Sequence, residues 1–122
     1  MEFAFHNFLP APTLPIMSRV SKGKTYERLA RKLLASDGFL CETKNYSRFQ
    51  GQDFYNLFDI LAIGKYTRLI QVKTNPTHFY KARKDIKEWI NINDIQGVSF
   101  EVWLKEPRKE WRVEIIEKEP DF

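Results

Sequence analysis

The chain has 122 residues, of which 43% are hydrophobic and 30% charged, and its formal net charge at pH 7 is +4. This size fits one globular domain with its own core, and the composition excludes a disordered chain and indicates no membrane role. Cys41 is the single cysteine, which excludes a disulfide framework and a multi-cysteine zinc site and is typical of a reducing, intracellular (cytoplasmic) setting. We expect it to pack as a small hydrophobic residue.

The first 17 residues are apolar and contain three prolines within "LPAPTLP". Proline forbids a regular helix there, so we expect an extended arm over residues 1–17 that lies on this subunit or on a neighbour. An arm that covers a second copy would favour a homodimer. The globular domain is expected over residues 18–122.

The segment "SKGKTYERLARKLLASDG", residues 21–38, predicts a helix, with Ser21 as its candidate N-cap and Gly38 as its stop. Its apolar residues follow helical spacing at Tyr26, Leu29, Ala30, Leu33 and Leu34. The segment "FLCETK" then reads as a short strand, and residues 45–56 form a polar loop that carries aromatic residues.

Residues 57–75, "LFDILAIGKYTRLIQVKTN", predict two strands joined by a tight turn. A second amphipathic helix follows Pro76 and ends before Gly97. The segments "VSFEVWLK" and "EWRVEII" then alternate as the two strands of a hairpin. The resulting order, αβββαββ, predicts an α/β domain with a mixed central sheet flanked by helices.

Three polar residues interrupt the apolar strands of 57–75: Asp59, Gln71 and Lys73. Burying such groups is costly unless they are paired or bound to a metal. Because side chains alternate along a strand, Gln71 and Lys73 share a face and can meet Asp59 at one end of the sheet. Glu27 lies at the edge of the first helix's apolar stripe, close in angle to Leu34, and could aim its carboxylate at the same rim.

These residue types suit a divalent metal ion and phosphodiester chemistry. Asp59, Glu27 and the amide oxygen of Gln71 are candidate ligands of Mg²⁺ or Mn²⁺, and Gln71 is the weakest of the three. Lys73 would orient the nucleophile and stabilise the transition state. Taken singly, each residue has a simpler interpretation: an ion-paired Asp59, a solvated Glu27, a core amide at Gln71 and a lysine at a strand end.

The helix with Glu27, "FDILAI" with Asp59, and "LIQVK" with Gln71 and Lys73 resemble the PD-(D/E)XK nuclease superfamily, and the chain's small size resembles its archaeal Holliday-junction-resolvase-like members. The resemblance implies a restriction-endonuclease-like αβββαβ core over about 18–105. It matches Asp59, Lys73 and Glu27 to the family's catalytic residues. Phe58 stands where the motif's nominal proline would be, and Gln71 replaces its nominal second acid.

Positive charge is concentrated between residues 18 and 50, where eight Lys or Arg residues outnumber three acidic ones. A basic surface suits a polyanion such as DNA, although solvated lysine-rich faces produce the same count. The expected DNA contacts from this region are Lys22, Lys24, Arg28 and Arg31. By the family resemblance, Ser47 and Arg48 lie in the loop that touches the DNA backbone.

The sequence therefore predicts a metal-dependent endodeoxyribonuclease that acts on branched or duplex DNA, as a homodimer. The main alternative is a nucleic-acid-binding module that keeps the nuclease fold but has lost turnover through Gln71. A further alternative is a structural subunit whose basic face contacts RNA or protein.

Overall fold

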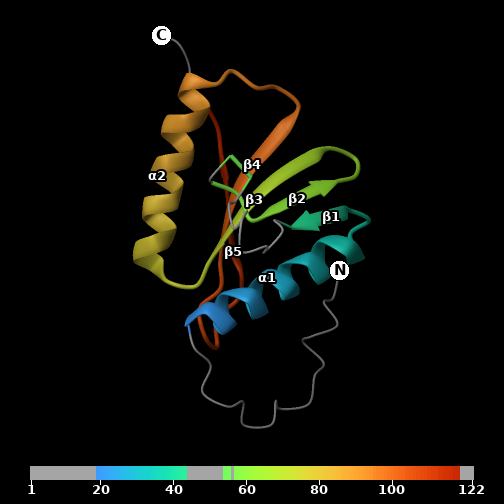
Figure 1. Cartoon of the computed structure of the whole chain (residues 1–122), viewed down its shortest axis with the longest axis vertical. Coiled ribbons are helices and arrows are strands. Elements are labelled where there is room, and N and C mark those ends of the chain that lie inside the picture. Colours follow the sequence, from blue (N-terminus) through green and yellow to red (C-terminus); the bar gives the residue numbers. More distant parts are fainter. Residues whose placement is uncertain (1–18, 44–53, 56, 119–122) are drawn as a thin grey trace, which may run out of the picture.

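The structure is a computed structural model that describes residues 19–43, 54, 55 and 57–118. Its elements follow the order α1 (Arg19–Ser36), β1 (Leu40–Thr43), β2 (Ile60–Ile63), β3 (Thr67–Lys73), α2 (Pro76–Ile92), β4 (Val98–Leu104) and β5 (Arg112–Ile116) (Figure 1). The predicted order αβββαββ is confirmed. The predicted arm over 1–17 lies outside the described residues, so that boundary stays a prediction.

The five strands form one mixed sheet in chain order, β1-β2-β3-β4-β5. Neighbouring strands are antiparallel except for β3 and β4, which run parallel and are joined through α2. Because β3 and β4 run parallel, their final residues Lys73 and Leu104 pair at the same edge of the sheet. The predicted mixed α/β architecture with two helices is therefore confirmed.

The end of α1 follows the prediction, but its start does not. Gly38 adopts a φ of 90°, which favours glycine, and the backbone N–H of Phe39 donates to the carbonyl oxygen of Leu34 at 3.0 Å. The helix extends N-terminally through Ser21 to Arg19. The prediction of Ser21 as the N-cap is therefore wrong, because a residue with helical backbone on both sides has no unpaired helix start to cap.

Helix α2 begins where the sequence indicates. Asn75 is its N-cap and accepts a hydrogen bond from the backbone N–H of Thr77 at 2.8 Å, and Pro76 opens the first turn. The helix ends at Ile92, while Gly97, with a φ of 81°, belongs to the connection into β4. Its buried residues are Phe79, Ala82, Ile86 and Ile90.

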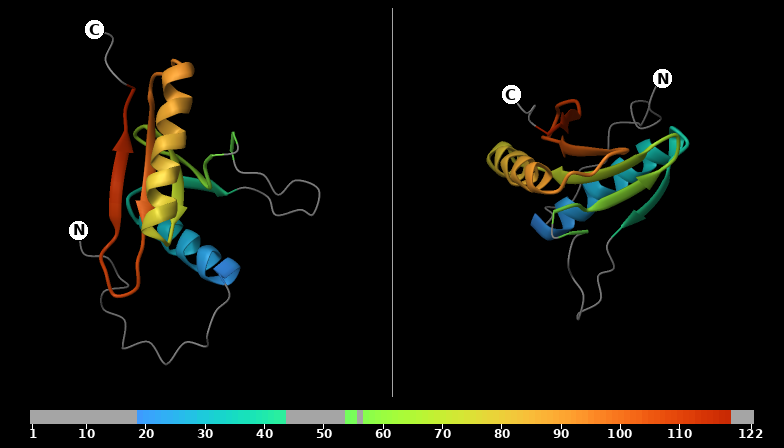
Figure 2. Two further views of the ribbon diagram at one scale, coloured as in Figure 1. Left: turned by 90° about the vertical axis from the view of Figure 1, so that its left-hand side faces the viewer. Right: turned by 90° about the horizontal axis from the view of Figure 1, so that it is seen from above.

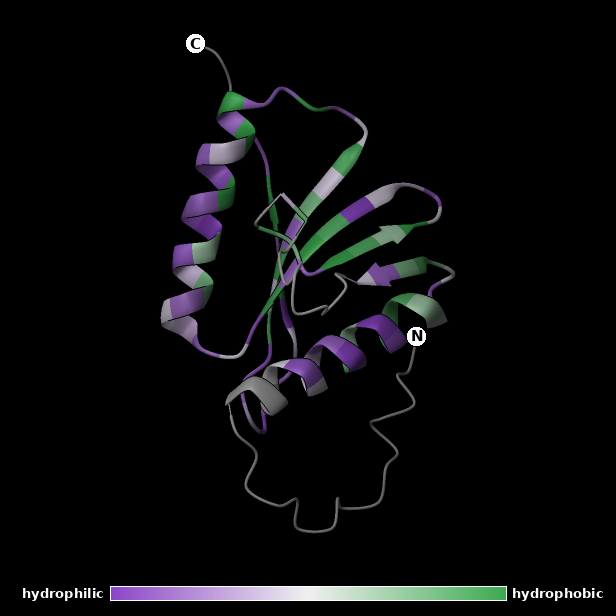
Figure 3. Ribbon diagram, in the orientation of Figure 1, coloured by the Kyte–Doolittle hydropathy of each residue, from purple (hydrophilic) through white to green (hydrophobic). Residues whose placement is uncertain are grey.

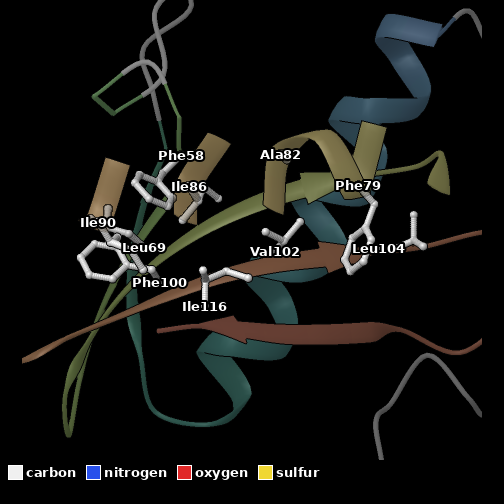
Figure 4. Close-up of a cluster of buried hydrophobic side chains, with 10 residues drawn as sticks. All are labelled: Phe58, Leu69, Phe79, Ala82, Ile86, Ile90, Phe100, Val102, Leu104 and Ile116. Atoms are coloured by element: carbon white, nitrogen blue, oxygen red, sulfur yellow. The ribbon is translucent and has the colours of Figure 1, made fainter. Parts of the chain in front are cut away.

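Two hydrophobic cores cover the two faces of the sheet (Figures 1 and 2). The α2-side core consists of Phe58, Leu69, Phe79, Ala82, Ile86, Ile90, Phe100, Val102, Leu104 and Ile116 (Figure 4). The α1-side core consists of Ala30, Leu33, Leu34, Phe39, Ile60, Ala62, Ile70, Val72 and Trp103. Hydrophobic bands run along β2, β3 and β4, whereas the outer side of α2 is largely hydrophilic (Figure 3).

The alternation of β3 sets the position of the polar residues. Leu69 packs in the α2-side core, whereas Ile70 and Val72 pack in the α1-side core. Gln71 and Lys73 therefore lie on the α2 side of the sheet, at the end of β3. No helix in the described part of the chain is long and apolar enough to cross a membrane.

Candidate functional site

Asp59 is buried directly before β2, with 4% of its surface exposed. Its backbone N–H donates to the carbonyl oxygen of Ile70 at 2.8 Å, and its carboxylate Oδ2 accepts from the backbone N–H of Val72 at 2.9 Å. The pairing of β2 with β3 ends at Ile60 and Ile70, and the carboxylate of Asp59 contacts the backbone of Val72, between Gln71 and Lys73. The predicted meeting of the Asp59 side chain with those of Gln71 and Lys73 stays a prediction.

Gln71 is buried in β3, with 7% of its surface exposed. In the amide orientation that satisfies both neighbours, its nitrogen donates to the carbonyl oxygen of Leu57 and its oxygen accepts from Lys73 Nζ at 3.0 Å. Gln71 thus links the segment before β2 to the lysine of the Q-x-K pattern. This arrangement agrees with the core-amide interpretation, while its role as a metal ligand stays a prediction.

Lys73 lies between two hollows at the end of β3. The α2-side hollow, about 270 Å³, is lined by Gln71, Lys73, His78, Lys81 and Asp85 among others. The α1-side hollow, about 610 Å³, also contains Lys73 and His78, together with Gly23 of α1. Lys73 therefore borders the space on both faces of the sheet at this edge.

His78 lines both hollows beside Lys73. It is exposed in the first turns of α2. The sequence carried one signal for it: a histidine at the start of the helix that directly follows the Q-x-K strand. That position brings it to the edge of the sheet where Lys73 ends β3.

Glu27 is half-buried in α1. Gly23, one helical turn earlier, lines the α1-side hollow with Lys73, and Leu34, at nearly the same angle around the helix, is buried in the α1-side core. By helical spacing Glu27 lies on the sheet-facing side of α1, and its half-burial agrees with this. That its carboxylate reaches the rim beside Lys73 stays a prediction.

The donor set at this edge is small. Among the described residues, no group of three or more His, Cys, Asp and Glu side chains could hold a metal ion. The predicted ligands contribute two carboxylates, Asp59 and Glu27, and one amide. Mg²⁺ is commonly held by one or two carboxylates, with waters and substrate phosphate oxygens completing its shell. That Asp59 and Glu27 bind one ion together stays a prediction.

The predicted DNA contacts are only partly described. Lys24, Arg28 and Arg31 are exposed along α1, starting next to the α1-side hollow at Gly23. Lys22 lies in α1, and its side chain is outside the described residues, as are Ser47 and Arg48.

Cys41 packs against the α1-side core, as predicted. Burial raises the pKa of the Cys41 thiol, and the positive charges of Arg31 and Arg68 oppose that rise only in part. A thiol with a raised pKa is a poor nucleophile at neutral pH.

A second polar network lies at the opposite end of β3 and was not predicted. Glu101 of β4 is fully buried and accepts from Arg68 Nε at 2.7 Å and from Arg68 Nη2 at 2.6 Å. Ser99 Oγ and Trp103 Nε1 also donate to it, at 2.8 and 2.9 Å. Burial lowers the pKa of Arg68, but the hydrogen bonds and charge of Glu101 more than offset this, so that pKa lies above its usual range.

The sequence marks Glu101 in the same way as Asp59, because Glu101 is an acid within an apolar strand, "VSFEVWL". Its carboxylate is saturated by donors from within the fold. The geometry therefore identifies it as a structural residue, in contrast to the polar residues that border the hollows around Lys73.

No protein-family model matches this chain, and no curated protein is significantly similar to it. The functional conclusion therefore follows from the residues of this chain and their arrangement.

Proposed function

We propose that this chain is a Mg²⁺- or Mn²⁺-dependent endodeoxyribonuclease of the PD-(D/E)XK type that hydrolyses phosphodiester bonds in branched or duplex DNA. One observation carries the proposal: Gln71 contacts Lys73 at the end of β3, where Lys73 borders two hollows, and the carboxylate of Asp59 accepts from the backbone N–H of Val72 between them. Unlike the self-contained network around Glu101, these residues include a lysine that borders both hollows.

The order of elements supports the same proposal. The αβββαβ portion, with one helix before the first strand and one between the third and fourth strands, resembles the restriction-endonuclease-like core. In that core the acid of the second strand and the lysine of the third strand share one active site. Asp59, directly before β2, and Lys73, the last residue of β3, are the residues that the resemblance matches to those two positions.

Each residue has a distinct proposed role. Asp59 and Glu27 would hold the ion through their carboxylates, while the backbone N–H of Val72 fixes the orientation of Asp59. Lys73, held at 3.0 Å by the oxygen of Gln71, would place its ammonium beside the phosphate and stabilise the charge that develops there. A divalent ion bound at these carboxylates supplies a water of lowered pKa and neutralises charge on the phosphate.

The direct test is incubation of purified protein with linear, nicked and four-way-junction DNA in Mg²⁺, in Mn²⁺ and in EDTA. The proposal predicts cutting in either metal and none in EDTA. Absence of cutting on every substrate in both metals would contradict it.

A non-catalytic nucleic-acid-binding module is the second candidate function. The observation that favours it is the engagement of Gln71 with Leu57 and Lys73, which satisfies the amide without a metal. This candidate predicts DNA binding with a steep salt dependence but no cutting, so the same experiment with a parallel binding measurement distinguishes the two.

A further inference from the structure

An exposed tyrosine in the segment before β2 packs on helix α2. Tyr55 has 66% of its surface exposed, and its φ of 53° lies in the left-handed region that favours glycine. Its ring packs on Trp89 of α2, with ring centroids 5.4 Å apart and ring planes at 38°. A large ring is thus presented to solvent from a backbone conformation that its residue type rarely adopts.

The ring below Tyr55 is firmly anchored. Trp89 makes edge-to-face contacts with Phe58 and Phe100, at centroid distances of 5.9 and 5.6 Å. Phe58 and Phe100 are buried in the α2-side core and lie 5.7 Å apart (Figure 4). Tyr55 is therefore the outermost ring of an aromatic stack, here defined as Tyr55, Trp89, Phe58 and Phe100, whose base is part of the core.

Residues close in sequence to two members of this aromatic stack line the α2-side hollow. Leu57, two residues after Tyr55, lines the hollow, and so does Asp85, one helical turn before Trp89. Of the charged groups in the hollow, Lys81 pairs with Asp85 at 2.9 Å, and Lys73 is held by Gln71. The hollow thus contains two ammonium groups and one carboxylate, which suits a phosphate more than a cation.

We propose that Tyr55 is a stacking platform for an unpaired nucleobase whose neighbouring phosphate enters the α2-side hollow. The inference rests on the proposed function in one respect, that the ligand is DNA. Proteins that bind single strands combine cationic grooves with exposed aromatic rings, because every unpaired base offers a face for stacking. Bases within a duplex are already stacked on their neighbours, so the site favours DNA with single-stranded nucleotides, such as a flap, a gap or an open junction.

The test measures binding in EDTA, where no cutting occurs, with a single-stranded oligonucleotide carrying one 2-aminopurine and with a duplex of the same sequence. Tyr55→Ala should weaken single-strand binding by roughly tenfold and abolish the stacking-dependent quenching of 2-aminopurine. Tyr55→Phe keeps the ring and should retain both. The matched control is Tyr80→Ala. Tyr80 is also an exposed tyrosine, but it belongs to α2, and its ring packs on Phe79. Melting curves establish that each variant is folded.

Unchanged single-strand affinity and quenching in folded Tyr55→Ala would overturn the inference, as would an equal loss of affinity for the single strand and the duplex. The outcome is independent of catalysis. Tyr55-dependent binding by a protein that never cuts DNA would contradict the nuclease proposal alone. Cutting without any dependence on Tyr55 would contradict only the stacking platform.

Discussion

Gln71 stands where the nuclease motif has its second acid. Its contacts determine what a glutamate at this position would change. Its amide nitrogen donates to the carbonyl oxygen of Leu57, and its oxygen accepts from Lys73. A glutamate at this position keeps the acceptor toward Lys73 but loses the donor toward Leu57. It also places a carboxylate against a carbonyl oxygen.

Gln71→Glu should therefore lower the Mg²⁺ concentration needed for half-maximal cutting and destabilise the fold by about 1–3 kcal/mol. The added charge tightens metal binding, whereas the unsatisfied carbonyl of Leu57 costs stability. The measurement is cutting rate against Mg²⁺ concentration for parent and variant, with a urea titration of each. Coincident metal curves would mean that position 71 does not contact the ion.

At the scale of elements, the sequence predicted the helices and strands that a regular hydrophobic periodicity indicates. The spacing of Leu33 and Leu34, together with Gly38, indicated α1 and its end, and the order of all seven elements is as expected. Local patterns did not reveal the start of α1 beyond Ser21 or the start of β2 at Ile60. Both boundaries depend on backbone hydrogen bonds whose partners are not visible in neighbouring residues.

The candidate site, too, could be predicted only as far as local sequence patterns reveal it. Acids and lysines inside apolar runs stand out in the sequence, so Asp59 and Lys73 could be named as candidates. The contact of Gln71 with Leu57, the place of His78 at both hollows and the stacking of Tyr55 on Trp89 arise from tertiary packing. A periodicity carries no information about such contacts between distant segments.

The pairing of β3 with β4 depends on a buried ion pair. Glu101→Ala leaves the guanidinium of Arg68, whose side chain is 12% exposed, without its carboxylate partner. Because a stranded buried charge is costly, unfolding free energy should fall by about 3–5 kcal/mol. Urea unfolding followed by circular dichroism measures the change, with exposed Glu88→Ala as the matched control. A loss no larger than that of the control would mean that Arg68 regains water and that the pair is dispensable.

At the scale of the whole molecule, the polar residues at the two ends of β3 have different surroundings. At the start of β3 the polar groups satisfy one another in the network around Glu101. At its end, Lys73 borders two hollows. Helix α1 extends away from the hollows at the end of β3. It carries a row of exposed basic residues along its length: Lys24, Arg28 and Arg31. A polyanion bound along α1 would therefore reach the candidate site.

Arg28→Ala should weaken binding of any DNA sequence alike and reduce the slope of log affinity against log salt by about 0.9, as expected for one phosphate contact. Fluorescence anisotropy in EDTA over a series of salt concentrations measures that slope. Lys65→Ala, an exposed lysine in the turn between β2 and β3, serves as the control. An effect confined to one DNA sequence would indicate base recognition, and an unchanged slope would remove α1 from the interface.

Asp59 offers the most direct test of the nuclease proposal. Asp59→Asn keeps the size of the side chain and an oxygen that can accept from the backbone N–H of Val72, while it removes the charge that a metal ion needs. The measurement is the single-turnover rate of DNA cutting in Mg²⁺ for the parent, for Asp59→Asn and for Asp94→Asn, an exposed aspartate that pairs with Lys118 at 3.6 Å. We expect Asp94→Asn to cut like the parent and Asp59→Asn to fall by roughly a hundredfold or more, with DNA affinity and melting temperature nearly unchanged. A folded Asp59→Asn variant that cuts as fast as the parent would contradict the proposed active site.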